Sequence, residues 1–91
     1  MADISIRRAH GMTVKKAKEA AQKVADHLDE RFDLESEWDG NTLVFRRHGV
    51  SGHLVVDKTH IAMDITLGFL LKPFKGAFVS EIEKNLDEMF G

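Results

Sequence analysis

Residues 34–67 read LESEWDGNTLVFRRHGVSGHLVVDKTHIAMDITL, and this stretch decides the fold. Apolar and polar residues alternate through most of it, which is typical of strands that bury one face. The alternation predicts four strands, at residues 34–38, 43–48, 53–56 and 60–67. Gly40-Asn41, a loop at residues 49–52 and Lys58-Thr59 separate them as hairpin turns. We therefore expect an antiparallel meander.

The turn lengths also predict a register. The loop at residues 49–52 pairs His48 with His53, and the turn at Lys58-Thr59 pairs His53 with Asp64. In this register every hairpin places its apolar residues on one face, and a slip by one residue would destroy that agreement. The residues expected on the buried face are Trp38, Leu43, Phe45, Leu54, Val56, Ile61, Met63, Ile65 and Leu67.

The flanking segments add one more strand and two helices. Ile4 and Ile6 alternate with polar residues and predict a short strand. Thr13 is suited to cap a helix over residues 14–32, and Pro73 suits the first position of a second helix. The predicted order is β-α-β-β-β-β-α, an α+β fold with an antiparallel sheet and two antiparallel helices on one face. Residues 1–91 are expected to form a single domain.

Composition excludes several classes of function. The formal net charge is −2, so no overall positive field exists to hold a nucleic acid. Cysteine is absent, which excludes disulfides and thiolate metal sites. No signal peptide is evident, and the apolar run at residues 67–71 is too short to cross a bilayer. A cytoplasmic protein without a transmembrane segment is expected.

Charges on both predicted helices oppose the helix dipole, because lysines lie near the start and acids near the end. If the helices lie side by side in opposite directions, the basic end of one meets the acidic end of the other. A binding site for anions is the alternative explanation. The contacts expected from helix pairing are Lys15 or Lys18 with Asp87 or Glu88, and Lys72 or Lys75 with Asp29 or Glu30.

No motif for catalysis is present. No nucleophile motif surrounds any serine, and no glycine-rich phosphate loop precedes a helix, so we expect no enzyme and no cofactor. The predicted register does place His48, His53 and Asp64 in one row, and two imidazoles with one carboxylate can hold a metal ion. The alternative interpretation is a hydrogen-bonded row on the surface. A metal-dependent enzyme using these three residues is a third functional hypothesis.

Residues 67–76 read LGFLLKPFKG, in which apolar residues alternate with lysines. One interpretation is a buried crossover from the sheet to the second helix. The other is an edge that meets a granule surface or an apolar ligand, with the lysine amines reaching outward. The residues expected to make that contact are Phe69, Leu70, Leu71, Lys72, Phe74 and Lys75.

The polar face of the predicted sheet suggests self-association. The register sets Glu35, Arg46, Val55 and Ala62 in one row, with an apolar middle and a charged rim. A wholly solvated face would be more uniformly polar. We expect a two-fold homodimer that uses this face, around Arg46, Val55 and Ala62, or an exposed edge of the sheet.

Several stretches together carry a resemblance to a known family. They are ISIRRAHG at residues 4–11, then residues 17–25, WDGN at residues 38–41, residues 45–52 and residues 67–76. In this order and spacing they resemble the polyhydroxyalkanoic acid system family, small bacterial proteins named from a polyhydroxyalkanoate granule gene region. The resemblance implies a bacterial cytoplasmic protein linked with storage polyester, and it brings no catalytic residues.

Two functional hypotheses follow from the resemblance and the predicted fold. The first is a non-enzymatic accessory protein that acts through contacts with granule proteins or with the polyester granule surface. The second is a binding protein that holds an apolar acyl ligand between the sheet and the helices.

Overall fold

A computed structural model describes residues 2–90 of the chain. The elements are β1 (Ile4–Ala9), α1 (Val14–Phe32), β2 (Glu35–Asp39), β3 (Thr42–Arg47), β4 (Val50–Val56), β5 (His60–Leu67), the 3₁₀ helix η1 (Phe69–Phe74) and α2 (Lys75–Phe90). The predicted order of strands and α-helices, and the α+β class, are confirmed.

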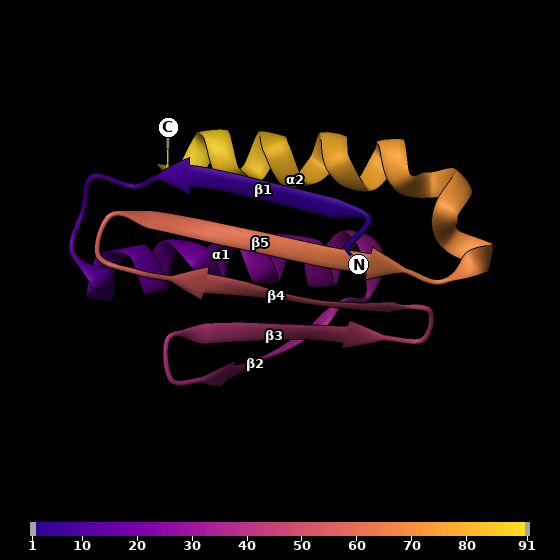
Figure 1. Cartoon of the computed structure of the whole chain (residues 1–91), viewed down its shortest axis with the longest axis horizontal. Coiled ribbons are helices and arrows are strands. Elements are labelled where there is room, and N and C mark those ends of the chain that lie inside the picture. The colour runs from indigo at the N-terminus through magenta and orange to yellow at the C-terminus, as the bar shows by residue number, and fades with distance from the viewer. Residues whose placement is uncertain (1, 91) are drawn as a thin grey trace.

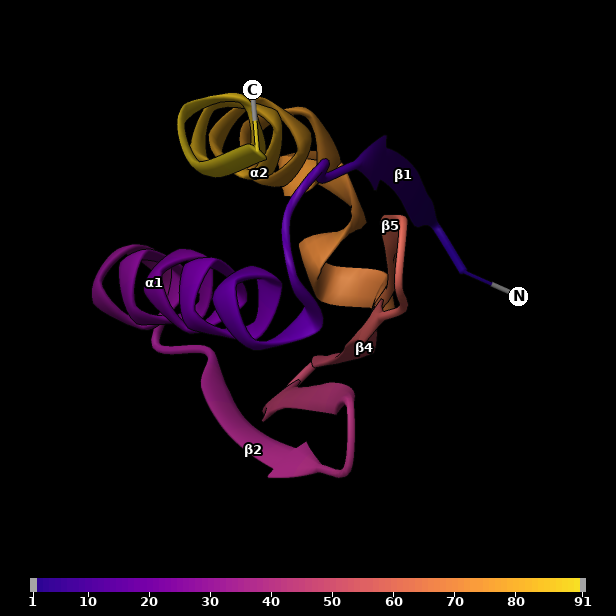
Figure 2. The ribbon, with the colours of Figure 1, turned by 90° about the vertical axis from the view of Figure 1, so that its left-hand side faces the viewer.

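Five strands form one antiparallel sheet in the order β1-β5-β4-β3-β2. The first strand of the chain therefore lies at an edge, beside the last one. Both α-helices lie on one side of the sheet and run in opposite directions (Figure 1). The sheet curls around them, which leaves its outer face uncovered by any element within residues 2–90 (Figure 2).

Local chemistry sets the ends of α1. The hydroxyl of Thr13 accepts the backbone N–H of Lys16 at 3.2 Å, so the predicted N-cap is confirmed. The helix ends at Asp33, which adopts a left-handed conformation with φ 56°. The Arg47 guanidinium donates to the carbonyl of Phe32 at 2.5 Å and binds this end of the helix to β3.

The predicted register is confirmed in two hairpins and wrong in one. Trp38 pairs with Leu43, and His53 pairs with Asp64, as expected. Between β3 and β4, however, His53 pairs with Val44 and not with His48. The cause is a two-residue turn at His48 and Gly49 in place of the expected loop, and the φ of 83° at Gly49 suits such a turn.

Strand β4 is consequently longer than predicted and carries Gly52 inside the sheet. A Cβ atom at Gly52 would lie 2.5 Å from the carbonyl oxygen of Asp64, so β4 and β5 approach closely there. On the other side of β4, Phe45 of β3 pairs with this glycine. A side chain at position 52 would separate the strands.

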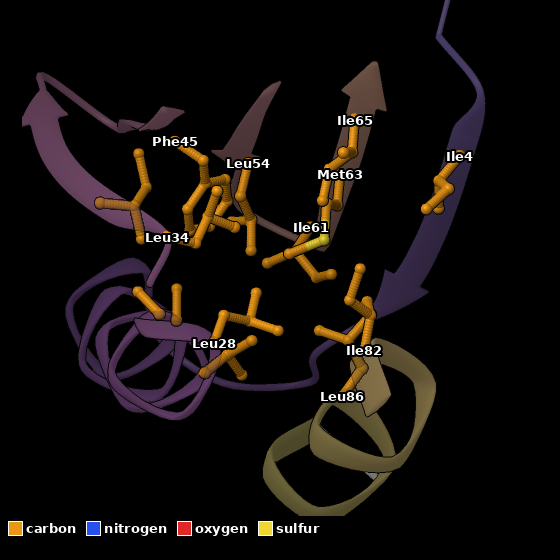
Figure 3. Packing of buried hydrophobic residues seen from close by; sticks show 14 of the residues in the cluster. Ile4, Leu28, Leu34, Phe45, Leu54, Ile61, Met63, Ile65, Ile82 and Leu86 are labelled. Carbon is orange, nitrogen blue, oxygen red and sulfur yellow. The ribbon is translucent and has the colours of Figure 1, made fainter. Parts of the chain in front are cut away.

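The core fills the space between the sheet and the helices (Figure 3). All residues predicted for the buried face are buried except Trp38, which is half-buried at the sheet margin. Its indole N–H donates to the side chain of Gln22 at 2.8 Å, and the amine of Lys18 lies 4.8 Å from its ring centre. Trp38 therefore covers one side of the core, while its polar contacts are with Gln22 and Lys18.

Two predictions about the helices need correction. Pro73 lies inside η1 and not at the first position of α2, which begins at Lys75. The two helices do run side by side (Figure 2), but the expected pairs between lysines and acids do not occur among residues 2–90. The ion pairs that α2 and η1 form instead are Arg31 with Glu81 at 3.7 Å, Arg8 with Asp87 at 3.3 Å, and Lys72 with Asp3 at 3.1 Å.

Candidate functional site

Three large apolar side chains on η1 are exposed to solvent. Phe69 is 84% exposed, Leu70 79% and Phe74 56%, whereas Val55 is the next such residue at 37%. We name Phe69, Leu70 and Phe74 the apolar ledge. It lies at the end of the molecule where β5 turns into α2 (Figure 1). Because exposed apolar clusters of this kind mark sites of interaction, the ledge is the candidate functional site.

The ledge is held in place by its neighbour Leu71. This side chain is half-buried and packs against the core, and its Cδ1 lies 3.1 Å from the position of a Cβ at Gly49. The N–H of Gly68 donates to the carbonyl of Gly49 at 2.6 Å, and the N–H of Leu71 donates to the carbonyl of Gly68 at 2.9 Å. These contacts fix η1 against the turn between β3 and β4, so Phe69 and Leu70 are directed outward from a supported backbone.

Asp3 links η1 to the end of β5. Its carboxylate accepts the N–H of Leu67 at 2.8 Å and the amine of Lys72 at 3.1 Å. The hydrogen bond from the Leu67 backbone, and then the bond from Lys72, hold the pKa of Asp3 below its ordinary value. The start of the chain, the end of β5 and η1 are thereby joined by one charged group.

Basic side chains flank the ledge. Lys72 and Lys75 are exposed beside it, and the first turn of α2 contains no acidic residue. Arg47 and His48 lie at the turn on which η1 rests. An apolar surface with flanking amines suits an interface that is apolar inside and polar or anionic outside, since lysine amines stay in water while their stems lie on apolar surface.

The sequence allowed two interpretations of residues 67–76, a buried crossover and an exposed surface, and each is correct for some of the residues. The buried crossover is correct for Leu71 and wrong for Phe69, Leu70 and Phe74. Of the six residues predicted to touch a granule or an apolar ligand, Leu71 is the support, and the other five are exposed. Whether they bind such a surface stays a prediction.

The predicted metal set is not assembled, because His48 lies in the turn and not beside His53. The imidazole of His53 lies 3.4 Å from the carboxylate of Asp64, which also accepts the hydroxyl of Ser5 at 2.7 Å. Within residues 2–90, no group of three or more His, Cys, Asp and Glu residues is placed to hold a metal ion. The Ser5 hydroxyl bonds to the carboxylate, so the row does not form the pair of nucleophile and base that acyl transfer requires.

His10 follows β1 and is buried, with 5% of its surface exposed. Its Nδ1 accepts the N–H of Met12 at 3.1 Å. Its Nε2 must then carry the proton, and it donates to the carbonyl of Asp57 at 2.7 Å. Both ring nitrogens are thus used to join the loop after β1 to the turn between β4 and β5, which is a structural role.

The second functional hypothesis, an acyl ligand between the layers, receives no support. The core side chains between the sheet and the helices are almost all fully buried and fill that space (Figure 3). The surface hollows lie elsewhere. Two are lined by Val44 and Arg46 together with residues of β2, and another follows the turn at Gly49.

The predicted interface row also needs correction on the outer face of the sheet. Arg46 pairs with Glu35 and Ser51, whereas Val55 pairs with Thr42 and Ala62. Val55 and Ala62 are therefore neighbours as predicted, and Arg46 lies in a different row. The change results from the turn at His48 and Gly49, which moves β3 along β4.

The comparisons with known proteins agree with the resemblance. The model of a family described as putative polyhydroxyalkanoic acid system proteins matches residues 4–90. No curated protein and no solved structure matches the chain. Within residues 2–90, no helix has the length and apolar character needed to cross a membrane.

Proposed function

Because the chain belongs to the polyhydroxyalkanoic acid system family, we propose that it is a non-enzymatic accessory protein that attaches to the surface of polyhydroxyalkanoate granules through the apolar ledge. The observation that carries the proposal is the exposure of Phe69, Leu70 and Phe74 on one short, supported segment. Such a protein acts in the cytoplasm, where the polyester is stored, and needs no cofactor.

The size of the ledge suits reversible attachment. Burying an exposed Phe or Leu side chain contributes about 1.5–3 kcal/mol, so three side chains offer on the order of 6 kcal/mol if all are buried. The entropy lost on binding offsets part of this gain. The remainder corresponds to weak binding by each copy, weaker than that of a single lipid anchor.

The lysines favour a surface over a closed pocket. Lys72 and Lys75 are exposed on the same segment as the ledge, and an ammonium group is costly to remove from water. At an interface, the rings of Phe69 and Phe74 enter the apolar side while the amines remain in the aqueous layer. Charge on the granule surface, whether from lipid head groups or from chain-end carboxylates, would add to the attraction.

Co-sedimentation with protein-free polyhydroxyalkanoate particles tests the proposal. We expect the variant Phe69→Ser/Leu70→Ser to bind at least about tenfold more weakly than the parent chain, since it removes most of the exposed apolar area. Its thermal stability should stay within about 0.5 kcal/mol of the parent, because both side chains are exposed. Parent protein that stays in the supernatant with bare particles, yet sediments with native granules, would assign the ledge to a granule protein instead.

The lysines have a matched control on the far end of the molecule. Lys75→Ser should weaken binding to anionic particles, whereas Lys16→Ser, on the first turn of α1, should leave it unchanged. Equal effects of the two substitutions would show that only the overall charge matters, and that the ledge does not orient the protein.

A further inference from the structure

The outer face of the sheet carries a small apolar centre, formed by Val44, Val55 and Ala62, among polar residues. Neither helix covers it (Figure 2). Its middle strands present small or β-branched residues among a few polar ones, and Val55 at its centre is 37% exposed. The outward residues of β3, β4 and β5 are Thr42, Val44, Arg46, Ser51, His53, Val55, His60, Ala62, Asp64 and Thr66.

The two edges of this face carry opposite charges. Strand β1 presents Arg7, while β2 presents Glu35, Glu37 and Asp39. Glu35 has Arg46 as its cross-strand neighbour, but Glu37 and Asp39 have no such cation beside them. Arg7, Glu37 and Asp39 form no ion pair with any residue between 2 and 90. These three charges are therefore available to a partner.

The register places Arg7 and Asp39 at opposite ends of one row. Arg7 pairs with Ala62, Ala62 with Val55, Val55 with Thr42, and Thr42 with Asp39. The strand that carries Val55, β4, is the middle strand of the five. The row is therefore positive at one end, apolar at its centre and negative at the other end. A two-fold axis through the centre can bring the positive end of one copy to the negative end of the other.

Two ways of stacking two such faces can be compared. If the axis runs across the strands, β1 lies on β1 and β2 lies on β2, which brings like charges together. If the axis runs along the strands, β1 of one chain lies on β2 of the other, which brings Arg7 toward the partner's Asp39. The second arrangement also sets Val55 against the partner's Val55 on the axis.

We propose that two copies of the chain pair through the outer faces of their sheets, about a two-fold axis that runs along the strands through β4. Because the sheet curls around its helices (Figure 2), the copies meet along the middle strands, and the charged edge residues form the rim. Sheets packed in this way keep their strands within about 30° of each other.

The arrangement has a consequence for the ledge. Rotation about an axis along the strands leaves each end of the sheet at the same end of the dimer. Because η1 lies at one end of the sheet (Figure 1), both ledges then project in the same direction, toward one surface. The copies meet along the middle strands and not across all five, so the dimer buries an area at the small end of the range for specific interfaces, on the order of 1,000 Å². This size predicts an equilibrium between monomer and dimer in the micromolar range.

A charge-reversal cycle measured by analytical ultracentrifugation tests the proposal. Arg7→Glu and Asp39→Arg should each weaken the dimer by about tenfold, because each places like charges together twice by symmetry. The double variant should restore the parent's dissociation constant to within about threefold. Lys16→Glu, on the first turn of α1, is the matched control and should change little. Circular dichroism checks that every variant is folded.

The contrary results are clear. A parent chain that stays monomeric up to about 1 mM would overturn the proposed dimer, because this concentration is far above a micromolar dissociation constant. Arg7→Glu with the parent's dissociation constant would overturn the chosen axis, because under the other axis residue 7 faces its own copy and the reversal only replaces one pair of like charges with another. A double variant no better than the single ones would overturn the contact between Arg7 and Asp39.

A dimer with two ledges should bind polyester particles more tightly than a monomer. This expectation rests on the proposed function and is tested by a separate measurement. Val55→Glu should produce a folded monomer that binds polyester particles at least about tenfold more weakly than the parent dimer, because bivalent attachment is lost. If the parent does not bind particles at all, the proposed function fails, whereas the sedimentation results still decide the dimer.

Discussion

Replacing Gly52 with alanine is expected to destabilise the sheet, although alanine is normally the better residue in a strand. The added Cβ would lie 2.5 Å from the carbonyl oxygen of Asp64 and 2.9 Å from Cγ1 of Ile65. The carbonyl belongs to the backbone of β5, so it can move only if the pairing of β4 with β5 changes.

The magnitude follows from two opposing effects. Removing the flexibility of glycine from the unfolded chain would stabilise the protein by about 0.4–1 kcal/mol. Overpacking costs about 1–3 kcal/mol, and contact with backbone places this position at the upper end of the range. The expected net loss is about 2 kcal/mol, which lowers the melting temperature of a domain of this size by roughly 8–16 °C.

Thermal and urea unfolding of Gly52→Ala measure this loss, and Gly76→Ala is the matched control. A Cβ at Gly76 would meet no atom within 4 Å, and this residue lies in the first turn of α2. The same substitution should therefore stabilise the protein there, by about 0.5 kcal/mol. If Gly52→Ala were as stable as the parent chain, the close approach of β4 and β5 would not constrain the sheet, and the reasoning would be wrong.

Three further predictions concern the groups that hold the loops and the ledge. His10→Ala should cost about 2 kcal/mol in urea unfolding, because it removes a buried side chain together with both of its hydrogen bonds, whereas His48→Ala, in an exposed turn, should cost less than about 0.5 kcal/mol. Leu71→Ala should cost about 1–2 kcal/mol, speed amide exchange in η1 and weaken particle binding, even though the ledge residues themselves are unchanged. The pKa of Asp3 lies below its ordinary value of 3.8. The ionised carboxylate therefore contributes its full share of the folding stability above that pH, and this share is lost as the pH falls through the lowered pKa. The stability of Asp3→Asn, followed by thermal melts between pH 6 and pH 2, should therefore fall less steeply in acid than that of the parent; parallel curves would contradict this assignment.

The sequence predicts which face of the sheet is buried, but not every pairing across it. The predicted turn between β3 and β4 lies too late in the chain, and the resulting register error is an even number of residues. Because side chains alternate with a period of two, an even shift changes partners and keeps faces. The buried residues were therefore predicted correctly, while the neighbours of His53 and Arg46 were not. The glycine at position 49, followed by the apolar Val50, indicated the shorter turn.

The ledge was harder to predict, because its exposure depends on contacts between distant segments. In sequence, Phe69, Leu70 and Leu71 are three consecutive apolar residues that differ little. Which of them turns inward is decided by Gly49, in a turn between two other strands, and by the backbone bond from Gly68 to it. Similarly, the acidic end of α2 meets Arg8 of β1, and no local pattern relates these two elements.

The position of β1 at the edge beside β5 also sets an order of events during synthesis. Ser5 and Asp64 pair across these strands although they are 59 positions apart. At about 5–20 residues per second, the ribosome needs roughly 3–12 s to make the partner after it has made β1. Meanwhile α1 and the local hairpins can form, since their contacts are between near neighbours in sequence.

During that interval, the first strand to be made has no sheet to join. Its apolar residues Ile4 and Ile6 stay open to solvent or to other nascent chains until β5 emerges. The docking of β1 is therefore expected to be a late step, and the step most open to misassembly between chains. Arg7 and Arg8, which follow these isoleucines, would oppose such encounters, because like charges on two copies of β1 repel.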